Sequence, residues 1–248
     1  MKFAVQDAKR ALTCKGNMIA CFTLCAIFIH AIRANVNLGE PVNTYEIIVA
    51  AMALSGFTPF AAVFATMGYA CRFCDEYHSG YIQMIISRDG WKKYGIIRMI
   101  TTGVAGGMTI AIPFFLVCVF AYVYGTHGMI HNMVYVGKRA EYYLENYGDV
   151  YVLGCKVLLG FIFGATWALV GMAFSVWFCN RYVSLIAPFV LYDIMWLMLY
   201  NVRIINPIFL IRGDDLNSYP LSMCMELVYL MLAVGVTWLG LYRRMQNE

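Results

Sequence analysis

The chain has 248 residues, of which 62% are hydrophobic and only 13% are charged, well below the roughly 25% of charged residues that is typical of soluble domains. This composition predicts an all-α integral membrane protein, organised as a single transmembrane domain over residues 1–248. The formal net charge is +4, and no basic segment outside the apolar runs is long enough to form a nucleic-acid surface, so we expect no nucleic-acid partner.

Six apolar stretches are long enough, at roughly 17 to 25 residues, to cross a bilayer as helices. They lie at about residues 16–32, 47–69, 96–124, 152–178, 182–200 and 221–242. The first stretch follows basic residues, as a secretory signal does, but no clean small-x-small cleavage pattern comes after it. We therefore expect six transmembrane helices, the first of them retained.

Lysine and arginine are distributed unevenly between the two sides of these spans. With the amino terminus inside, 12 of the 18 basic residues fall on the cytoplasmic side and five on the outer side, and Lys156 lies at the outer end of the fourth span. Cytoplasmic segments carry the excess of basic residues in membrane proteins. The pattern predicts a multi-pass protein of a bacterial cytoplasmic membrane with both termini in the cytoplasm.

The amino-terminal segment, residues 1–15, interleaves apolar and charged side chains. Phe3, Val5 and Leu12 alternate with Lys2 and Lys9. Such a mix predicts an amphipathic helix that lies on the inner leaflet, with its basic side chains facing anionic head groups. A disordered cytoplasmic tail is the alternative.

Proline and glycine occur inside the second and third spans. Pro59 lies in the second span, and the third contains Pro113 together with several glycines. Small residues let membrane helices approach closely, and a proline removes a hydrogen bond where a helix can bend. Packing is the expected role of both prolines, and a hinge is the alternative.

A charged segment over residues 71–95 separates spans two and three and is expected to form a cytoplasmic loop with a helix. If residues 78–88 are helical, one face carries an apolar stripe. This stripe consists of Tyr81, Ile82, Ile85 and Ile86. Asp89 and Gly90 predict the end of the helix, because glycine adopts the left-handed conformation without a Cβ penalty.

The same loop contains Cys71-x-x-Cys74 followed by His78. Zinc sites use such spacings, but a second Cys or His pair is absent from the sequence around it. Ordinary interfacial cysteines are the expected interpretation, and no metal is expected in this chain.

The largest outer segment is predicted at residues 125–151. Lys138, Glu141, Tyr142 and Glu145 suit a short surface helix at the outer interface. His127 and His131 are four residues apart, as metal ligands on a helix can be, but no third ligand is near in sequence. In the fourth span, which follows, Gly160-x-x-x-Gly164 favours a tight helix contact, within the chain or with a second copy.

The fifth span carries Asp193 near its middle, where a charge is expensive and usually faces a cavity or a partner. We consider Asp193 a candidate for the translocation route; the alternative is an interior residue that is neutral or paired with Lys156. Residues 201–220 are too apolar for a free loop and too short to cross, so they predict a re-entrant outer element before span six. Cys155 and Cys224 both lie near the outer surface, and a disulfide between them is left open.

No catalytic constellation is present in the sequence. The chain has no Gly-x-x-x-x-Gly-Lys-Ser/Thr phosphate loop and no His-Glu-x-x-His motif. We therefore expect a chain without catalytic residues and without a nucleotide site of its own.

The arrangement of six spans, an amphipathic amino-terminal helix, an inner helical loop and a re-entrant outer element resembles the membrane-spanning subunit of a type-2 ABC exporter. The most specific part is a run of about thirty residues that enters the third span. It consists of Phe73, Glu76, Gly80, Ile85, Ile86, Ser87, Tyr94 and Arg98. Arg88 stands where that family commonly has a proline.

This resemblance implies a separate cytoplasmic ABC ATPase, which would hold ATP and magnesium, and a second membrane subunit, identical or related. It also implies that the inner helix couples the two proteins. The expected coupling residues are Glu76, Gly80, Tyr81, Ile82, Ile85, Ile86 and Arg88. An amphipathic helix can lay its apolar stripe into a groove on such a partner, and the alternative is a helix that rests on the lipid surface.

Two function hypotheses follow. The first is the permease subunit of an ATP-driven exporter that moves an amphipathic or hydrophobic cargo by alternating access; a peptide such as a bacteriocin or toxin is the leading cargo, and a drug or lipid is the alternative. The second is an integral membrane enzyme or a non-transport sensor, which would need polar groups that converge within the spans.

Overall fold

The computed structural model describes residues 2–37, 42–126, 138–213 and 218–246, and within these ranges it contains helices and no strand. In chain order they are α1 (Lys2–Leu12), α2 (Lys15–Asn35), α3 (Thr44–Met52), the 3₁₀ helix η1 (Thr58–Phe60), α4 (Ala61–Thr66), α5 (Arg72–His78), α6 (Tyr81–Asp89), α7 (Trp91–Tyr124), α8 (Lys138–Phe178), α9 (Arg181–Met198), α10 (Pro207–Arg212) and α11 (Tyr219–Gln246). The expected all-α class is confirmed for these residues.

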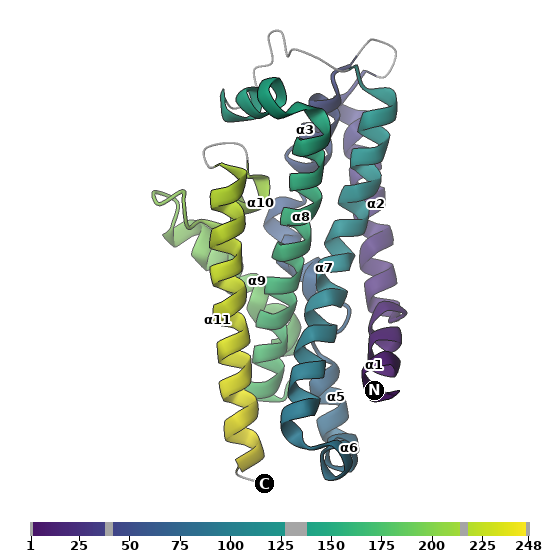
Figure 1. Cartoon of the computed structure of the whole chain (residues 1–248), viewed down its shortest axis with the longest axis vertical. Coiled ribbons are helices and arrows are strands. Elements are labelled where there is room, and N and C mark those ends of the chain that lie inside the picture. The colour runs from purple at the N-terminus through teal and green to yellow at the C-terminus, as the bar shows by residue number, and fades with distance from the viewer. Residues whose placement is uncertain (1, 38–41, 127–137, 214–217, 247–248) are drawn as a thin grey trace.

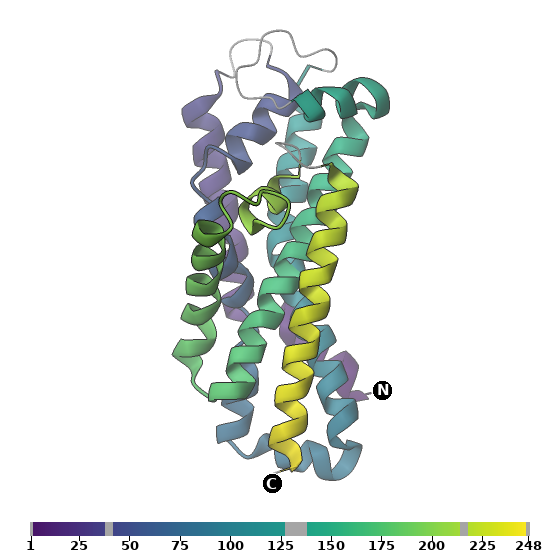
Figure 2. The same ribbon diagram turned by 90° about the vertical axis from the view of Figure 1, so that its left-hand side faces the viewer.

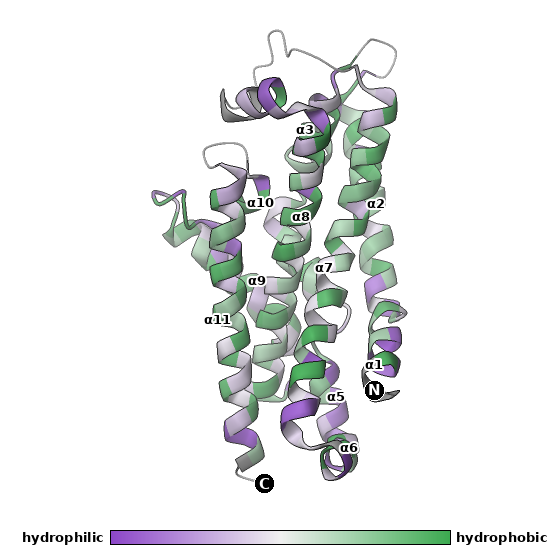
Figure 3. Ribbon diagram, in the orientation of Figure 1, coloured by the Kyte–Doolittle hydropathy of each residue, from purple (hydrophilic) through white to green (hydrophobic). Residues whose placement is uncertain are grey.

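The long helices form an elongated bundle (Figures 1 and 2). α2, α7, α8 and α11 run along its long axis, and both ends of the chain lie toward the same end of the bundle as α5 and α6. The middle of the bundle is mainly hydrophobic, and hydrophilic residues gather toward its two ends (Figure 3). We call the end with α5 and α6 the terminal end.

Five helices of the described residues are long and apolar enough to cross a membrane. They are Lys15–Asn35, Trp91–Tyr124, Tyr142–Phe178, Arg181–Met198 and Tyr219–Met245. A sixth crossing is present if the bent pair Thr44–Met52 and Phe57–Thr66 counts as one span. The chain is thus an all-α membrane protein.

The second predicted span, residues 47–69, is bent and does not form one continuous helix. α3 ends at Met52, and the axis turns by 70° before η1 and α4. Gly56 in the connection has φ +69°, a conformation that glycine adopts without steric cost. Pro59 follows in the first turn of η1, where its missing N–H costs no helical hydrogen bond. Pro113, in contrast, lies inside the continuous helix α7.

Glycines allow α7 and α8 to pack closely. A Cβ added to Gly164 of α8 would lie 2.4 Å from the carbonyl oxygen of Gly106 in α7, and one added to Gly160 would lie 2.7 Å from the Phe114 ring. The small-residue pair of the fourth span therefore serves a contact within the chain.

The helix predicted around residues 138–145 is present as the first part of α8. The backbone departs from helical geometry at Gly148, which has φ 77° and ψ 169°, and the part before it crosses the end of the bundle opposite the terminal end (Figure 2). His127 and His131 lie outside the described residues.

The apolar cluster at residues 208–211 is packed inside the protein as α10. Asn206 caps this helix by accepting a hydrogen bond from the Ile208 N–H at 3.1 Å, and its Nδ2 donates to the Trp196 carbonyl at 3.0 Å. Ile208, Leu210 and Ile211 are buried. Cys155 and Cys224 are both free thiols.

Candidate functional site

A buried cluster of charged and hydroxyl side chains joins α1, α5, the segment before α5 and α7 at the terminal end. We call it the Arg98 cluster; its members are Asp7 of α1, Tyr69 before α5, Glu76 of α5, and Tyr94, Arg98 and Thr101 of α7. Arg98 is 0% exposed. Its Nη1 lies 2.7 Å from Asp7 Oδ1, and its Nη2 lies 2.9 Å from Glu76 Oε2. The guanidinium also lies 4.5 Å from the centre of the Tyr69 ring, a cation–π distance.

Hydroxyl groups donate further hydrogen bonds to the carboxylates of Asp7 and Glu76. Tyr69 and Thr101 each donate to Asp7 at 2.6 Å, one to each oxygen. Tyr94 donates to Glu76 Oε2 at 3.0 Å. Charges inside a protein persist only when they are paired and hydrogen-bonded. The cluster therefore fixes α1 and α5 to the base of α7.

The position of Asp7 adds a contact that the sequence did not predict. α1 is helical, but its charged Asp7 faces the protein at 1% exposure, whereas Val5 is 71% exposed. The helix is thus attached to α7 by its acidic side chain. Sequence reasoning missed this contact because Asp7 and Arg98 are 91 positions apart.

Several residues of the run between Phe73 and Arg98, on which the family resemblance is based, contact one another in the structure. Three of its members, Glu76, Tyr94 and Arg98, meet in the cluster. A fourth, Phe73, is buried beside them in a core that also holds Ile82 and Ile85. The spacing of these residues reflects the return of the chain from α5 through α6 to α7.

α6 begins and ends at glycines with positive φ, as the sequence indicates for its end. Gly80 (φ 70°) precedes Tyr81, and Gly90 (φ 81°) follows Asp89. The helix starts at Tyr81, because Gly80 separates it from α5, so it is shorter at its start than the predicted 78–88, and His78 belongs to α5.

The apolar stripe of α6 faces the chain itself, which corrects the expectation that it inserts into a partner. Ile82 and Ile85 are 1% and 4% exposed, and Tyr81 and Ile86 pack against the same core. The exposed face carries Gln83, Met84, Ser87 and Arg88. Met84 is 70% exposed. A partner that docks on α6 in this conformation meets that face.

The cysteine pair of this loop lies in the protein interior. Cys74 Sγ is 3.5 Å from His78 Nδ1, and His78 Nδ1 is 2.8 Å from the Cys74 carbonyl oxygen. Burial raises the pKa of the Cys71 and Cys74 thiols. No group of three or more potential metal ligands occurs among the described residues.

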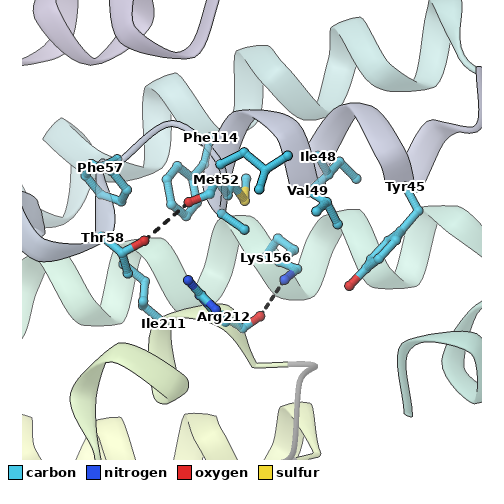
Figure 4. Close-up of a pocket in the computed structure, with 12 residues that line it drawn as sticks. Tyr45, Ile48, Val49, Met52, Phe57, Thr58, Phe114, Lys156, Ile211 and Arg212 are labelled. Carbon is cyan, nitrogen blue, oxygen red and sulfur yellow. Dashed lines mark hydrogen bonds between the residues drawn. The ribbon is translucent and has the colours of Figure 1, made fainter. Parts of the chain in front are cut away.

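A second candidate site is a cavity of about 210 Å³ at the break between α3 and η1 (Figure 4). Its basic lining residues are Lys156 of α8 and Arg212 of α10. Lys156 is 4% exposed and its Nζ donates to the Arg212 carbonyl. The same Nζ lies 6.0 Å from the centre of the Tyr45 ring. The cavity thus combines one buried basic side chain, Lys156, and the partly buried Arg212 with a broken helix. Broken helices occur at the binding sites of transporters. Asp214 and Asp215, which follow α10, lie outside the described residues.

Asp193 does not join this cavity. It is partly buried on α9, and its Oδ1 has no hydrogen-bond partner within the described part of the chain. An ion pair between Asp193 and Lys156, considered from the sequence, is not found there.

Comparisons with known proteins found no matching family model, no similar curated protein and no similar solved structure. The functional interpretation therefore rests on the geometry of the chain itself.

Proposed function

We propose that the chain is the permease subunit of an ATP-driven exporter of the type-2 ABC class, in a bacterial cytoplasmic membrane. The observation that carries the proposal is the Arg98 cluster, which ties the α5 and α6 pair to α1 and α7 through buried charges. A loop that only connected two spans would not need such an attachment. A loop that transmits force to a transmembrane helix would.

In this proposal the terminal end faces the cytoplasm, and a soluble ATPase docks on the exposed face of α6. The sequence lacks a phosphate loop, so ATP and magnesium belong to that partner. Movement of α6 passes to α5 through their shared core and to α7 through the contact between Glu76 and Arg98. A second membrane subunit, identical or related, completes the route.

The proposed cargo is amphipathic or hydrophobic, with a peptide as the leading class. The break between α3 and α4 and the adjacent cavity provide a place where backbone polar groups can be exposed inside the bundle. Ile211 and Arg212 of α10 line the same cavity.

A membrane sensor is the second candidate, and the Lys156 cavity favours it. A small cavity lined by Lys156 and Arg212 can bind a ligand without moving it across the membrane. Such a protein would need no ATPase.

Affinity purification of the chain from its native membrane tests the proposal. We expect a soluble protein with a phosphate loop to co-purify and to hydrolyse ATP, whereas the chain alone should not hydrolyse it. Recovery of the chain without any ATPase, under conditions that preserve other membrane complexes, would refute the exporter and leave the sensor.

A further inference from the structure

A groove of about 440 Å³ runs along α8 between α9 and α11. In Figure 2 these helices lie on either side of α8. The lining is almost entirely apolar and rich in aromatic rings, among them Trp167, Phe174, Trp177 and Tyr229. Its size suits a drug-sized ligand.

Next to this groove lies a carboxyl group without a partner. Glu226 of α11 is 0% exposed, and neither of its oxygens has a hydrogen-bond partner among the described residues. Ser222 Oγ, one turn earlier on the same face, and Trp167 Nε1, in the groove lining, also have none there. Buried polar groups nearly always have a hydrogen-bond partner, so three such groups without one call for an explanation.

Helix geometry places Glu226 at the end of the groove. Tyr229, Ala233 and Val236 line it, and Glu226 precedes them on the same face of α11 by the helical repeat. Three residues correspond to about 4.5 Å along the axis. Glu226 is not itself a lining residue, so its carboxyl group lies behind the groove wall, one helical turn from Tyr229.

We infer that Glu226 and this groove form a binding site for a lipophilic organic cation that enters from the membrane. Aromatic faces attract cations, and the attraction is stronger where water is excluded. A carboxylate in an apolar environment needs a positive charge beside it, and the groove leaves room for one. The proposed occupant is thus an aromatic phosphonium or quaternary ammonium compound. The Glu226 carboxylate would favour such a cation over a neutral lipid chain. The inference does not depend on the ATPase partner.

Equilibrium binding of tetraphenylphosphonium to the purified chain in lipid nanodiscs tests the site, with empty nanodiscs subtracted. Saturable binding is expected, and Glu226→Gln should weaken it by about tenfold, or 1.4 kcal/mol, because the amide keeps the shape and loses the charge. Asp193→Asn changes the acid of α9 that does not line the groove and should leave binding unchanged. Tetraphenylborate, with the same shape and the opposite charge, should not compete.

A measurement on the unmodified chain covers the case in which Glu226→Gln fails to fold. A hydrophobic carbodiimide should modify Glu226, as detected by mass spectrometry, and tetraphenylphosphonium should slow that modification. Equal binding by parent and Glu226→Gln, competition by tetraphenylborate, or modification that is indifferent to the phosphonium would each overturn the inference. The last two outcomes would identify the groove as an ordinary lipid contact.

Discussion

Arg98 holds together side chains that are far apart in the sequence. Its guanidinium contacts Asp7 and Glu76, and its own exposure is 0%. Arginine suits this position because its planar group donates in several directions at once. Within the described part of the chain, the next positive charge near either carboxylate is Arg72, which lies 3.9 Å from Glu76 with its side chain 46% exposed.

Removal of Arg98 should therefore destabilise the fold strongly. Arg98→Met leaves two buried carboxylates without their counter-charge, which typically costs about 3–5 kcal/mol. Arg88→Met, on the exposed face of α6, should change the free energy of unfolding by less than about 0.5 kcal/mol. Thermal unfolding of both variants in detergent checks this contrast, and equal midpoints would show that the cluster contributes little.

The cysteines of α5 and the turn before it should react slowly. The thiolate is the nucleophile, and burial raises the pKa of Cys71 and Cys74, so less thiolate is present at neutral pH than at an ordinary cysteine with a pKa of about 8.5. Maleimide labelling of a chain with only these two cysteines should be slow at pH 7.5 and should accelerate as the pH rises above 9. Unfolded chain provides the control. Acceleration by a chelator alone at pH 7.5 would indicate a bound metal instead.

Only part of the residue-scale picture could be predicted from the sequence. Glu76 and Arg98 were singled out from the sequence as parts of one run, but their contact with each other was not predicted. Asp7 gave no such signal, because the pairing of α1 with α7 depends on tertiary packing. Glu226 lies in the sixth apolar stretch, but that its carboxyl oxygens have no hydrogen-bond partner among the described residues is a property of the packed structure.

At the scale of helices, the close contact of α7 with α8 depends on backbone approach. Gly164 and Gly106 leave no space for an added methyl group, since the nearest atom would lie 2.4 Å away. Gly154 lies in the same helix, and an added Cβ there would meet nothing within 4 Å. Gly164 and Gly154 therefore form a matched pair for substitution by alanine.

Gly164→Ala should lower the free energy of unfolding by about 1–3 kcal/mol through overpacking. Gly154→Ala should be neutral or stabilising by up to about 1 kcal/mol, because alanine favours the helix. Unfolding midpoints of the two variants, measured under identical detergent conditions, decide the matter. Similar destabilisation of both would mean that α7 and α8 are not in close contact.

Helix positions were predicted more successfully than helix continuity. Hydropathy located the apolar helices, and Gly90 correctly marked the end of α6. For the stretch 47–69 a hinge at Pro59 was only the alternative to packing, because the whole stretch is apolar and hydropathy does not report where backbone hydrogen bonds are interrupted. The face of α6 was also misjudged: the apolar stripe was recognised, but its partner is the chain's own core. Ile82→Asp and Ile85→Asp would thus disturb folding before they could report on coupling.

At the scale of the whole molecule, the terminal end combines both chain ends, α5 and α6 and the Arg98 cluster (Figure 1). In the proposed exporter this end receives the ATPase. The exposed Met84 is the apolar side chain that α6 offers to a partner, and Met198, which is 81% exposed at the end of α9, offers a comparison away from α6.

ATP hydrolysis by the chain and its co-purified ATPase in nanodiscs is the most direct test of that coupling. We predict that the parent chain retains the ATPase and supports hydrolysis, that Met84→Asp reduces both by about tenfold, equivalent to 1.4 kcal/mol of lost contact, and that Met198→Asp leaves both unchanged. Full retention and full hydrolysis with Met84→Asp, at matched expression and folding, would contradict the proposal that α6 couples this chain to an ATPase.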